Sequence, residues 1–419
     1  MSLPRVLFGL EGDAMSFDQH HRVHGDLPGA VDRYPALIGE ITRAVLRGRG
    51  GGGFPLGRKL ETVLRGGGDP VVVVNACEGE PMSVKDQMLL RSLPHLVLDG
   101  ALCCARAVRS RKIVVAVDQT SVLGADAIDQ AIEDRDDIGS GGIGIEIVDI
   151  PPGYVSGQET SIVSFLNGGP ATPTYPPRIF ERGVDRHPTL VANPETLANA
   201  ALIARRGAKW FRQVGTPEEP GSVLVTLAGA VRQPGVYEIE YGSAMRTLLT
   251  AAGNSSEPVR AFLIGGYAGT WVDAPSGEQV RLSRAGLKRI GGSMGAGVIV
   301  AFPESACPVA EVTRVMDWMA DQSAGQCGPC VHGLGSIAQT LDEVAVGAGV
   351  RDAAFNVRRW ASQLPGRGAC AHPDGAARFV SSAMSVFAEE FDDHARHGPC
   401  DACAGRPVLA TPGLVGAGR

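Results

Sequence analysis

Long apolar runs, a secretory leader and a collagen-like repeat are all absent from this sequence. No apolar stretch approaches the roughly 18 residues that a membrane-spanning helix requires, and the stretch 96–108 is interrupted by Asp99 and Arg106. The N-terminal segment 1–11 has no long apolar core of the kind found in secretory signals. Glycine does not recur with a Gly-X-Y period, which excludes collagen. We therefore expect a cytoplasmic protein without a membrane span of its own.

An excess of positive charge is absent as well. The chain has 39 basic and 45 acidic residues, which gives a formal net charge of −6. A large protein that binds nucleic acid without sequence preference is normally basic, so we exclude nucleic acid as a partner. The cysteines number nine, an odd count, and they fall into two C-x-x-C pairs and scattered single positions. In a chain that is not secreted, this pattern predicts reduced thiols and metal ligation rather than disulfides.

Glycine, in contrast, is abundant. The 56 glycines and 28 prolines make up a fifth of the 419 residues, against about 12% in average proteins. Apolar residues at 44% and charged residues at 20% are typical of a globular chain rather than a disordered one. The length predicts two to four domains. The glycine excess therefore calls for tight connections, or for a site where a ligand touches the backbone.

The first part of the chain predicts an α/β fold. Short buried-strand runs alternate with helical patterns at 71–74, 94–108, 113–117, 121–133 and 144–148. This order favours a parallel sheet with right-handed crossovers. Ligands of such sheets lie at the carboxyl ends of the strands, so the segment after Val74 is the expected place for chemistry.

Further along, the pattern changes twice. A turn-rich boundary at 216–221 precedes a compact α+β pattern, and helical periodicity dominates from Pro308 onward. The predicted organisation is an α/β domain at 1–215, an α+β module at 216–298, a helical bundle at 299–403 and a loose tail at 404–419.

A glycine-rich loop spans Arg47–Lys59. Gly48, Gly50 and Gly53 match the G-x-G-x-x-G pattern formally. The helical pattern before the loop, and Pro55 within it, do not fit a standard dinucleotide-binding turn. Glycines nevertheless let a backbone approach an anion closely, and basic residues flank this loop. The alternatives are an anion-binding loop and a flexible surface turn.

An acidic turn follows the first predicted strand. Asn75, Glu78 and Glu80 come directly after the run 71–74. Their polar groups are suited to hydrogen-bonding a ribityl or ribose chain, at the edge where a parallel sheet presents its site. The alternative is an ordinary solvated turn.

These elements, in this order, resemble the NADH-binding flavoprotein subunit of respiratory complex I, a subunit with counterparts in soluble NAD-reducing hydrogenases and formate dehydrogenases. Gly48–Lys59 resembles the family pattern G-R-G-G-A-G-F-P-x-G-x-K, and Asn75–Asp86 resembles N-A-D-E-G-E-P-G-x-x-K-D. Tyr154–Thr160 is similar to Y-x-C-G-E-E-T, and Pro188–Ala198 is similar to P-T-x-x-N-N-x-E-T-L-A. The resemblance covers about residues 35–395. It implies a Rossmann-like FMN-binding domain, a β-grasp module of the soluble-ligand-binding type and a helical iron–sulfur bundle.

The resemblance also implies a set of cofactor-binding residues. The residues expected at the flavin phosphate and ring are Gly48, Arg49, Gly50, Gly51, Lys59, Asn75, Glu78, Asn193 and Thr196. Those expected at the nicotinamide nucleotide are Phe54, Glu80 and Glu159, and the segment with Tyr154, Gly157 and Gln158 completes the flavin site. Among the positions that depart from the family pattern, four bear on the flavin and nucleotide sites. Cys77 and Gln158 replace carboxylates, Thr62 stands where an aromatic residue is frequent, and Arg178 replaces a phenylalanine.

The C-terminal cysteines indicate an iron–sulfur site. Cys327 and Cys330 have the x-x spacing that can hold adjacent corners of an iron–sulfur cube, and Cys370 follows later. Compared with the family pattern S-C-G-x-C-x-P-C, Ala324 stands in place of the first ligand. We take Cys400 as the fourth ligand. The open alternatives are Cys403, Cys307 or His372, a cluster with three protein ligands, loss of the cluster, and a zinc site made by Cys327, Cys330, Cys400 and Cys403.

The predicted function is oxidation of NADH or NADPH. A hydride passes to FMN, and single electrons leave through a four-iron cluster to a protein acceptor such as a ferredoxin or a membrane reductase subunit. Such a partner would place the chain at the inner face of a membrane complex. The alternative is a non-catalytic paralogue that serves as a scaffold or assembly subunit of a redox complex.

Overall fold

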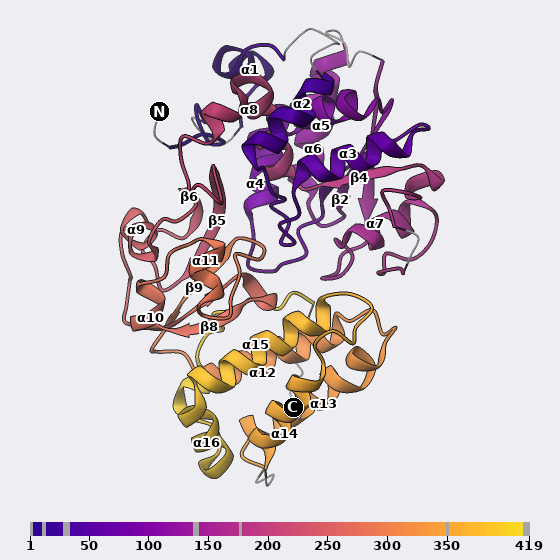
Figure 1. Ribbon diagram of the computed structural model, residues 1–419. Coiled ribbons are helices and arrows are strands. Elements are labelled where there is room, and N and C mark those ends of the chain that lie inside the picture. Colours follow the sequence, from indigo (N-terminus) through magenta and orange to yellow (C-terminus); the bar gives the residue numbers. More distant parts are fainter. Residues whose placement is uncertain are drawn as a thin grey trace. The chain divides into compact units, whose positions relative to one another are not determined.

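The computed structural model describes residues 3–10, 14–27, 34–136, 142–175, 178–348 and 352–413 (Figure 1). The chain forms two compact units. Unit 1 consists of Met1–Gly79, Val84–Val225 and Val236–Gly242. Unit 2 consists of Glu80–Ser83, Thr226–Gly235 and Ser243–Arg419. The finer division into three domains and a tail stays a prediction, and residues 414–419 of that tail lie outside the described residues.

Unit 1 is built on a four-stranded sheet in the order β3-β2-β1-β4. Its strands are β1 (Val71–Ala76), β2 (Lys112–Asp118), β3 (Gly144–Ile150) and β4 (Thr189–Ala192), and every pair is parallel. The predicted parallel α/β sheet is therefore confirmed. Sequence reasoning missed β4, which pairs along β1 with Val71 opposite Thr189. Because Val71–Val74 is buried on both faces, the run reads as continuously apolar rather than alternating.

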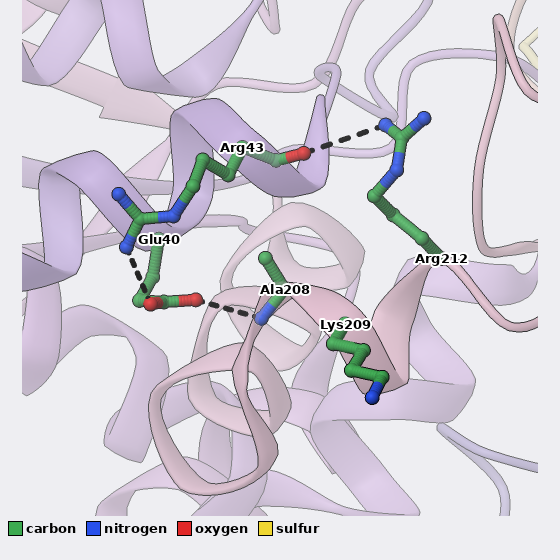
Figure 2. Close-up of a pocket in the computed structure, with 5 residues that line it drawn as sticks. All are labelled: Glu40, Arg43, Ala208, Lys209 and Arg212. Atoms are coloured by element: carbon green, nitrogen blue, oxygen red, sulfur yellow. Dashed lines mark hydrogen bonds and ion pairs between the residues drawn. The ribbon is translucent and has the colours of Figure 1, made fainter.

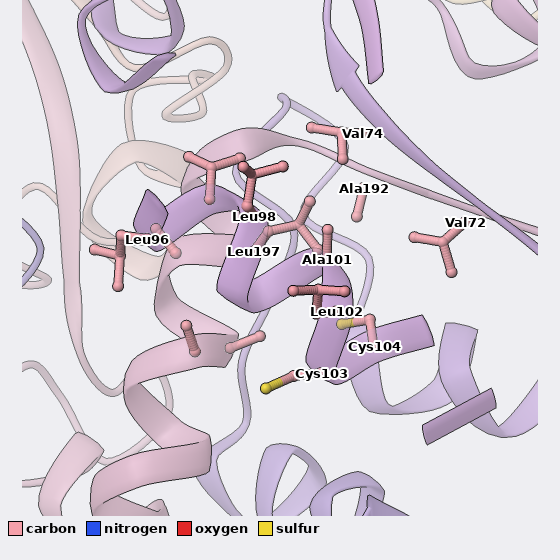
Figure 3. Close-up of a cluster of buried hydrophobic side chains, with 14 of the residues drawn as sticks. Val72, Val74, Leu96, Leu98, Ala101, Leu102, Cys103, Cys104, Ala192 and Leu197 are labelled. Carbon is pink, nitrogen blue, oxygen red and sulfur yellow. The ribbon is translucent and has the colours of Figure 1, made fainter. Parts of the chain in front are cut away.

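Helices surround this sheet. They are α1 (Phe17–His24), α2 (Tyr34–Ala44), α3 (Leu56–Gly66), α4 (Lys85–Ser92), α5 (Pro94–Val108), α6 (Val122–Asp136), α7 (Glu159–Leu166) and α8 (Pro194–Phe211). The short 3-10 turn η2 (Val184–Arg186) precedes β4. Helix α5 packs closely on α8 because Gly100 carries no side chain. A Cβ there would lie 1.9 Å from the carbonyl oxygen of Leu197. Figure 3 shows Leu98 and Leu102 of α5 beside Leu197, with Cys103 and Cys104 in the same apolar core.

A buried polar network ties α5 to its neighbours. Asp99 accepts hydrogen bonds from Nε2 of His20 at 2.7 Å and from Arg135 at 2.8 Å, and it also pairs with Arg205. His95 lies against His20, with ring centroids 5.7 Å apart. Burial alone would raise the pKa of Asp99, but the hydrogen bond from His20 and the guanidinium groups of Arg135 and Arg205 hold that pKa well below its usual range.

His24 adjoins this network, with its ring centroid 4.9 Å from that of His20, and the buried histidines predict that unit 1 loses stability in mild acid. Burial lowers the pKa of His24 to about 3 and that of His95 to about 4. The unfolded chain takes up these protons near pH 6.5, so the free energy of unfolding should fall as the pH drops from 6.5 toward 4. We expect a slope of about 1–2 kcal/mol per pH unit, measured by urea unfolding at several pH values. His24→Gln should flatten the slope, and His21→Gln, at an exposed side chain, should not.

Unit 2 contains the larger part of a five-stranded sheet in the order β6-β5-β9-β7-β8. The strands are β5 (Ser222–Gly229), β6 (Gly235–Glu240), β7 (Val259–Ile264), β8 (Thr270–Asp273) and β9 (Val298–Pro303), and β5 and β6 cross the boundary between the units. Strand β5 runs parallel to β9, whereas β7 is antiparallel to β8 and β9. The short helices are α9 (Met245–Ala251), η3 (Gly266–Ala268), α10 (Ala274–Glu278) and α11 (Arg284–Lys288). This mixed sheet agrees with an α+β module, and its assignment to the β-grasp type stays a prediction.

The helical part of unit 2 forms the predicted bundle. Its elements are α12 (Pro308–Asp321), η4 (Pro329–Leu334), α13 (Gly335–Ala345), α14 (Ala353–Gln363), α15 (His372–Val386), α16 (Ala388–His397) and η5 (Asp401–Ala404). The segment 408–412 differs from the expected loose tail because it is bonded to α12. Glu311 accepts the backbone N–H of Leu409 at 2.8 Å, and Trp318 donates to the carbonyl of Pro412 at 2.9 Å.

Among the described residues, no single helix is both long enough and apolar enough to cross a membrane. Helices α4 and α5 pass such a test only as a pair, and they are bent by 96° relative to each other.

Candidate functional site

The glycine loop lies between α2 and α3 and has a closed base. Arg47 and Pro55 form a β-bridge, and the N–H of Gly48 donates to the carbonyl of Phe54 at 2.9 Å. Gly51 and Gly53 have φ values of +97° and +61°, which side-chain-bearing residues rarely adopt. Gly48 and Gly51, both predicted at the flavin, therefore lie in a defined turn rather than in a flexible one. Phe54, predicted at the nucleotide, is 51% exposed at the end of this turn.

Arg49 supports the loop from within unit 1. Its guanidinium is buried and donates to the carbonyl of Ser222 at 2.9 Å and to the hydroxyl of Tyr241 at 2.5 Å. Its backbone N–H donates to Oγ1 of Thr196 at 2.9 Å. The side chain predicted to hold a phosphate is thus already used to fix the loop, and only the neighbouring backbone is left to meet a ligand.

The loop lies over the beginning of α8. Asn193 caps this helix, since its Oδ1 accepts the N–H of Glu195 at 3.1 Å. A Cβ placed on Gly50 would lie 3.3 Å from Cβ of Asn193, so the loop approaches the helix end as closely as a glycine permits. The N-terminus of a helix carries free N–H groups and a partial positive charge, both of which favour a phosphate. Gly50, Asn193 and Thr196, predicted together from separate motifs, meet here.

Lys59 adds a cation to this group. Its Nζ donates to the carbonyl of Val191 at 3.1 Å and pairs with the carboxylate of Glu159 at the start of α7. The two charged residues predicted for the flavin and nucleotide sites therefore lie together, at the carboxyl end of β4.

The acidic turn packs against the segment that contains Tyr154. Nδ2 of Asn75 donates to the carbonyl of Gly157 at 2.8 Å. A Cβ on Gly157 would lie 2.7 Å from the carbonyl of Cys77, and one on Gly79 would lie 2.8 Å from that of Tyr154. Glycine is required at both positions for this approach. The structure thus brings Asn75, Tyr154 and Gly157 together, and Gln158, next in the chain, occupies the N-cap position of α7 without a capping side-chain bond.

Two carboxylates of the turn have protein partners. Glu78 accepts the backbone N–H groups of Asp86 and Gln87 at 3.1 and 3.0 Å, which stabilises the start of α4. Glu80 belongs to unit 2, where it is buried and accepts the N–H of Tyr267 at 2.9 Å. Their predicted contacts with flavin and nicotinamide stay predictions.

A buried ion network beneath the site was missed by sequence reasoning. Nζ of Lys85 lies 2.7 Å from Asp86 and 3.2 Å from Glu195, and the three side chains are at most 7% exposed. Glu195 also lies 3.6 Å from Arg49. Burial raises the pKa of Glu195, while Lys85 and Arg49 oppose that rise. Lys85 and Asp86 are adjacent opposite charges in the sequence. Their partner Glu195 lies more than a hundred residues away, so no local pattern links the three.

The predicted thiol ligands fall into two groups. Burial, together with the nearby Cys327 and Cys370, raises the pKa of Cys330 to about 12. These three thiols gather around the π-helical turn η4, a distortion that often marks functional sites. Cys400, taken as the fourth ligand, has its contacts in the other group, where its Sγ lies 3.8 Å from that of Cys403. The contacts therefore favour three cysteine ligands over the set that includes Cys400.

The residues present fit both cofactors. A glycine turn over a helix N-terminus, with a lysine beside it, suits a flavin phosphate. The thiols of Cys327, Cys330 and Cys370, none of them fully exposed, are the soft donors that an iron–sulfur cluster takes.

A separate pocket between α2 and α8 contains none of the predicted site residues (Figure 2). Gly207 has a φ of +80° and interrupts α8, which leaves the N–H of Ala208 without a helical partner. Glu40 accepts that N–H at 2.8 Å and pairs with Arg43 at 2.5 Å. Glu40 thus replaces the hydrogen-bond acceptor that the break in α8 removes from the N–H of Ala208.

Two family models match this chain. Residues 41–202 match the Nuo51 FMN-binding domain, and residues 310–394 match the NADH-ubiquinone oxidoreductase-F iron-sulfur binding region. The first range contains every predicted flavin and nucleotide residue, and the second contains Cys327, Cys330 and Cys370 but not Cys400.

The chain is also similar to named proteins. It is 32% identical over 379 residues to an F-type subunit of NADH-quinone oxidoreductase from Rhizobium meliloti, covering 87% of this chain and 90% of the relative. It is 31% identical over 401 residues to the corresponding F-type subunit from Streptomyces coelicolor, covering 92% and 89%. A crystal structure of an NAD+-reducing [NiFe]-hydrogenase in the H2-reduced state superposes with a TM-score of 0.82 at 29% identity, covering 88% of this chain and 64% of that one. These findings confirm the predicted family, the FMN and iron–sulfur cofactors, and the class of NADH-oxidising oxidoreductases.

Proposed function

Because the chain belongs to the family of F-type subunits of NADH-quinone oxidoreductase, we propose that it takes electrons from NADH or NADPH and passes them singly to a protein acceptor. A small ferredoxin or a membrane reductase subunit has suitable chemistry for this acceptor. The chain would then work as one subunit of a larger redox complex, at the inner face of a membrane where the acceptor is a membrane reductase.

The observation that carries this proposal is the glycine loop closed over the N-terminus of α8. Backbone N–H groups of the loop and of the helix, together with Lys59, would hold the FMN phosphate. Asn75 would position the ring edge from the carboxyl end of β1. FMN, when bound, accepts a hydride from the reduced nicotinamide and gives up the electrons one at a time. No acid–base residue is needed, because the protein supplies position and electrostatics.

Cys327, Cys330 and Cys370 would hold the cluster in unit 2. The cluster, when bound, relays single electrons. With Ala324 in place of a fourth cysteine, one corner has no ligand in this motif. Because a neutral thiol at Cys77 and an amide at Gln158 replace two carboxylates, we also expect a less negative flavin environment than in relatives that keep them.

The non-catalytic alternative rests on the same departures at Ala324, Cys77 and Gln158. It predicts a colourless protein that keeps the fold. Our proposal predicts flavin absorption that NADH bleaches under anaerobic conditions, together with iron and sulfide.

The cysteines can be tested by Cys330→Ser. We expect this variant to lose the iron and sulfide and to keep the NADH-bleachable flavin. Reduction of a ferredoxin used as probe should fall to background, because the flavin then lacks its electron exit. Ser323→Ala, next to the same turn, serves as the matched control and should transfer electrons normally. Ferredoxin reduction at the wild-type rate by Cys330→Ser would contradict the proposed exit route.

A further inference from the structure

Four potential metal ligands meet at the C-terminal end of the helical bundle, apart from the three thiols around η4. They are Cys307, His394, Cys400 and Cys403, and their donor atoms all lie within 4.8 Å of one another. Cys307 comes directly before α12, His394 lies in α16, and the other two flank η5. All four belong to unit 2.

The distances between these atoms match the edges of one tetrahedron. Sγ of Cys403 lies 3.4 Å from Sγ of Cys307 and 3.8 Å from that of Cys400. Nε2 of His394 lies 3.5 Å from Sγ of Cys307 and 3.9 Å from that of Cys403. A tetrahedral ion with bonds of about 2.3 Å to sulfur and 2.0–2.1 Å to nitrogen has edges of roughly 3.5–3.8 Å. The four side chains are therefore spaced for a single ion.

The geometry points to a structural zinc site made by Cys307, His394, Cys400 and Cys403. Three thiolates and one imidazole form a closed donor set typical of structural zinc. A four-iron cube would require its ligands on four different irons, and hence farther apart than the edge of one tetrahedron. Three of the four residues also lie outside the matched iron-sulfur region 310–394.

The burial of the ligands supports this assignment. Cys307 and His394 are 3% exposed, whereas Cys400 is exposed at the surface. Nε2 of His394 faces the thiols, so it is the nitrogen available to the ion. Zinc binds cysteine as the thiolate, so zinc binding to the three protonated thiols would release three protons to solvent. The exposed side gives the ion a path of entry.

Zinc at this position would anchor the end of the chain. Cys400 and Cys403 precede the segment 408–412, which lies along α12 through Glu311 and Trp318. The site would thus join the start of α12, the end of α16 and the C-terminal segment through one ion, in a bundle whose described residues contain no disulfide.

The test is metal analysis of the full-length protein and of two cysteine variants purified anaerobically. We expect about one zinc per chain in the wild type, less than about a tenth of that in Cys403→Ser, and unchanged iron in that variant. Cys330→Ser should show the reverse, with iron lost and zinc kept. The FMN content of both variants reports that unit 1 is folded. Cobalt substitution of the wild type should give the intense visible bands of a tetrahedral thiolate site, and these should vanish in Cys403→Ser.

A second measurement reports on the order of the segment 408–412. Hydrogen exchange of the amides of Val408 and Leu409 should accelerate at least about tenfold in Cys403→Ser. Wild-type protein without zinc, zinc retained by Cys403→Ser, or iron in place of zinc would each overturn the assignment. None of these results bears on flavin reduction by NADH, so the proposed redox function stands or falls separately.

Discussion

Replacing Glu195 by alanine should destabilise unit 1 by about 3–5 kcal/mol, the cost typical of removing one partner from a buried charge pair. The carboxylate of Glu195 is fully buried, lies 3.2 Å from Nζ of Lys85 and accepts the N–H of Leu224 at 2.9 Å. Its removal takes away one of the two carboxylates that lie within ion-pair distance of Lys85, and it takes away the carboxylate that lies 3.6 Å from Arg49. Urea unfolding followed by circular dichroism would measure the loss.

Two further variants make this prediction specific. Glu61→Ala removes an exposed carboxylate that lies 3.5 Å from Arg65, and it should cost no more than about 0.5 kcal/mol. The double variant Lys85→Met with Glu195→Leu should recover only part of the lost stability, because it removes the charge of Lys85 but leaves Asp86 and Arg49 buried without these partners. A loss below about 1 kcal/mol in Glu195→Ala would show that Asp86 alone satisfies Lys85.

The same network should also affect flavin binding. Arg49 is held by Glu195 and in turn fixes the glycine loop through the carbonyl of Ser222. Glu195 begins the helix on which the proposed phosphate site lies. A folded variant with altered Glu195 should therefore bind FMN more weakly, although Glu195 itself contacts no flavin in our proposal.

The sequence was informative where local patterns decide the structure. Strands β1 and β2 followed from uninterrupted runs of valine, isoleucine and alanine that only a buried parallel strand accommodates. Strand β4 was missed because Thr189–Ala192 has only four residues and its pairing with β1 depends on contacts more than a hundred positions away. Short strands are defined by their neighbours rather than by their own composition.

The candidate cofactor and metal sites show the same difference between features that local sequence determines and features that depend on distant contacts. The residues around the glycine loop could be predicted because each lies in a local motif whose resemblance to a family was specific. The role of Arg49 could not, since its partners Ser222 and Tyr241 lie beyond any motif. For the thiols, spacing linked only Cys327 and Cys330, and the choice of Cys400 over Cys403, Cys307 or His372 had no local pattern behind it. Which thiols lie together depends on the tertiary packing of α15 and α16. This packing brings His394, which belongs to no recognisable motif, beside Cys307.

Filling the glycine cradle should abolish tight FMN binding. In Gly50→Leu, the new side chain would meet Asn193 at the N-terminus of α8, where a Cβ alone would already lie 3.3 Å from Cβ of that residue. The bulk would then occupy the place where the phosphate approaches the backbone N–H groups. We expect FMN affinity to fall at least about 100-fold, equivalent to about 2.7 kcal/mol, in a titration of the apoprotein followed by quenching of flavin fluorescence.

The loop supplies its own control for this experiment. A Cβ on Gly52 would meet nothing within 4 Å, and that residue is exposed, so Gly52→Ala should bind FMN as the wild type does. Lys59→Ala should weaken binding through loss of the cation, whereas Arg58→Ala, at an exposed position, should not. Wild-type affinity in Gly50→Leu would place the flavin phosphate elsewhere. Equal losses in Gly50→Leu and Gly52→Ala would mean that the flexibility of the loop matters, rather than the space above α8.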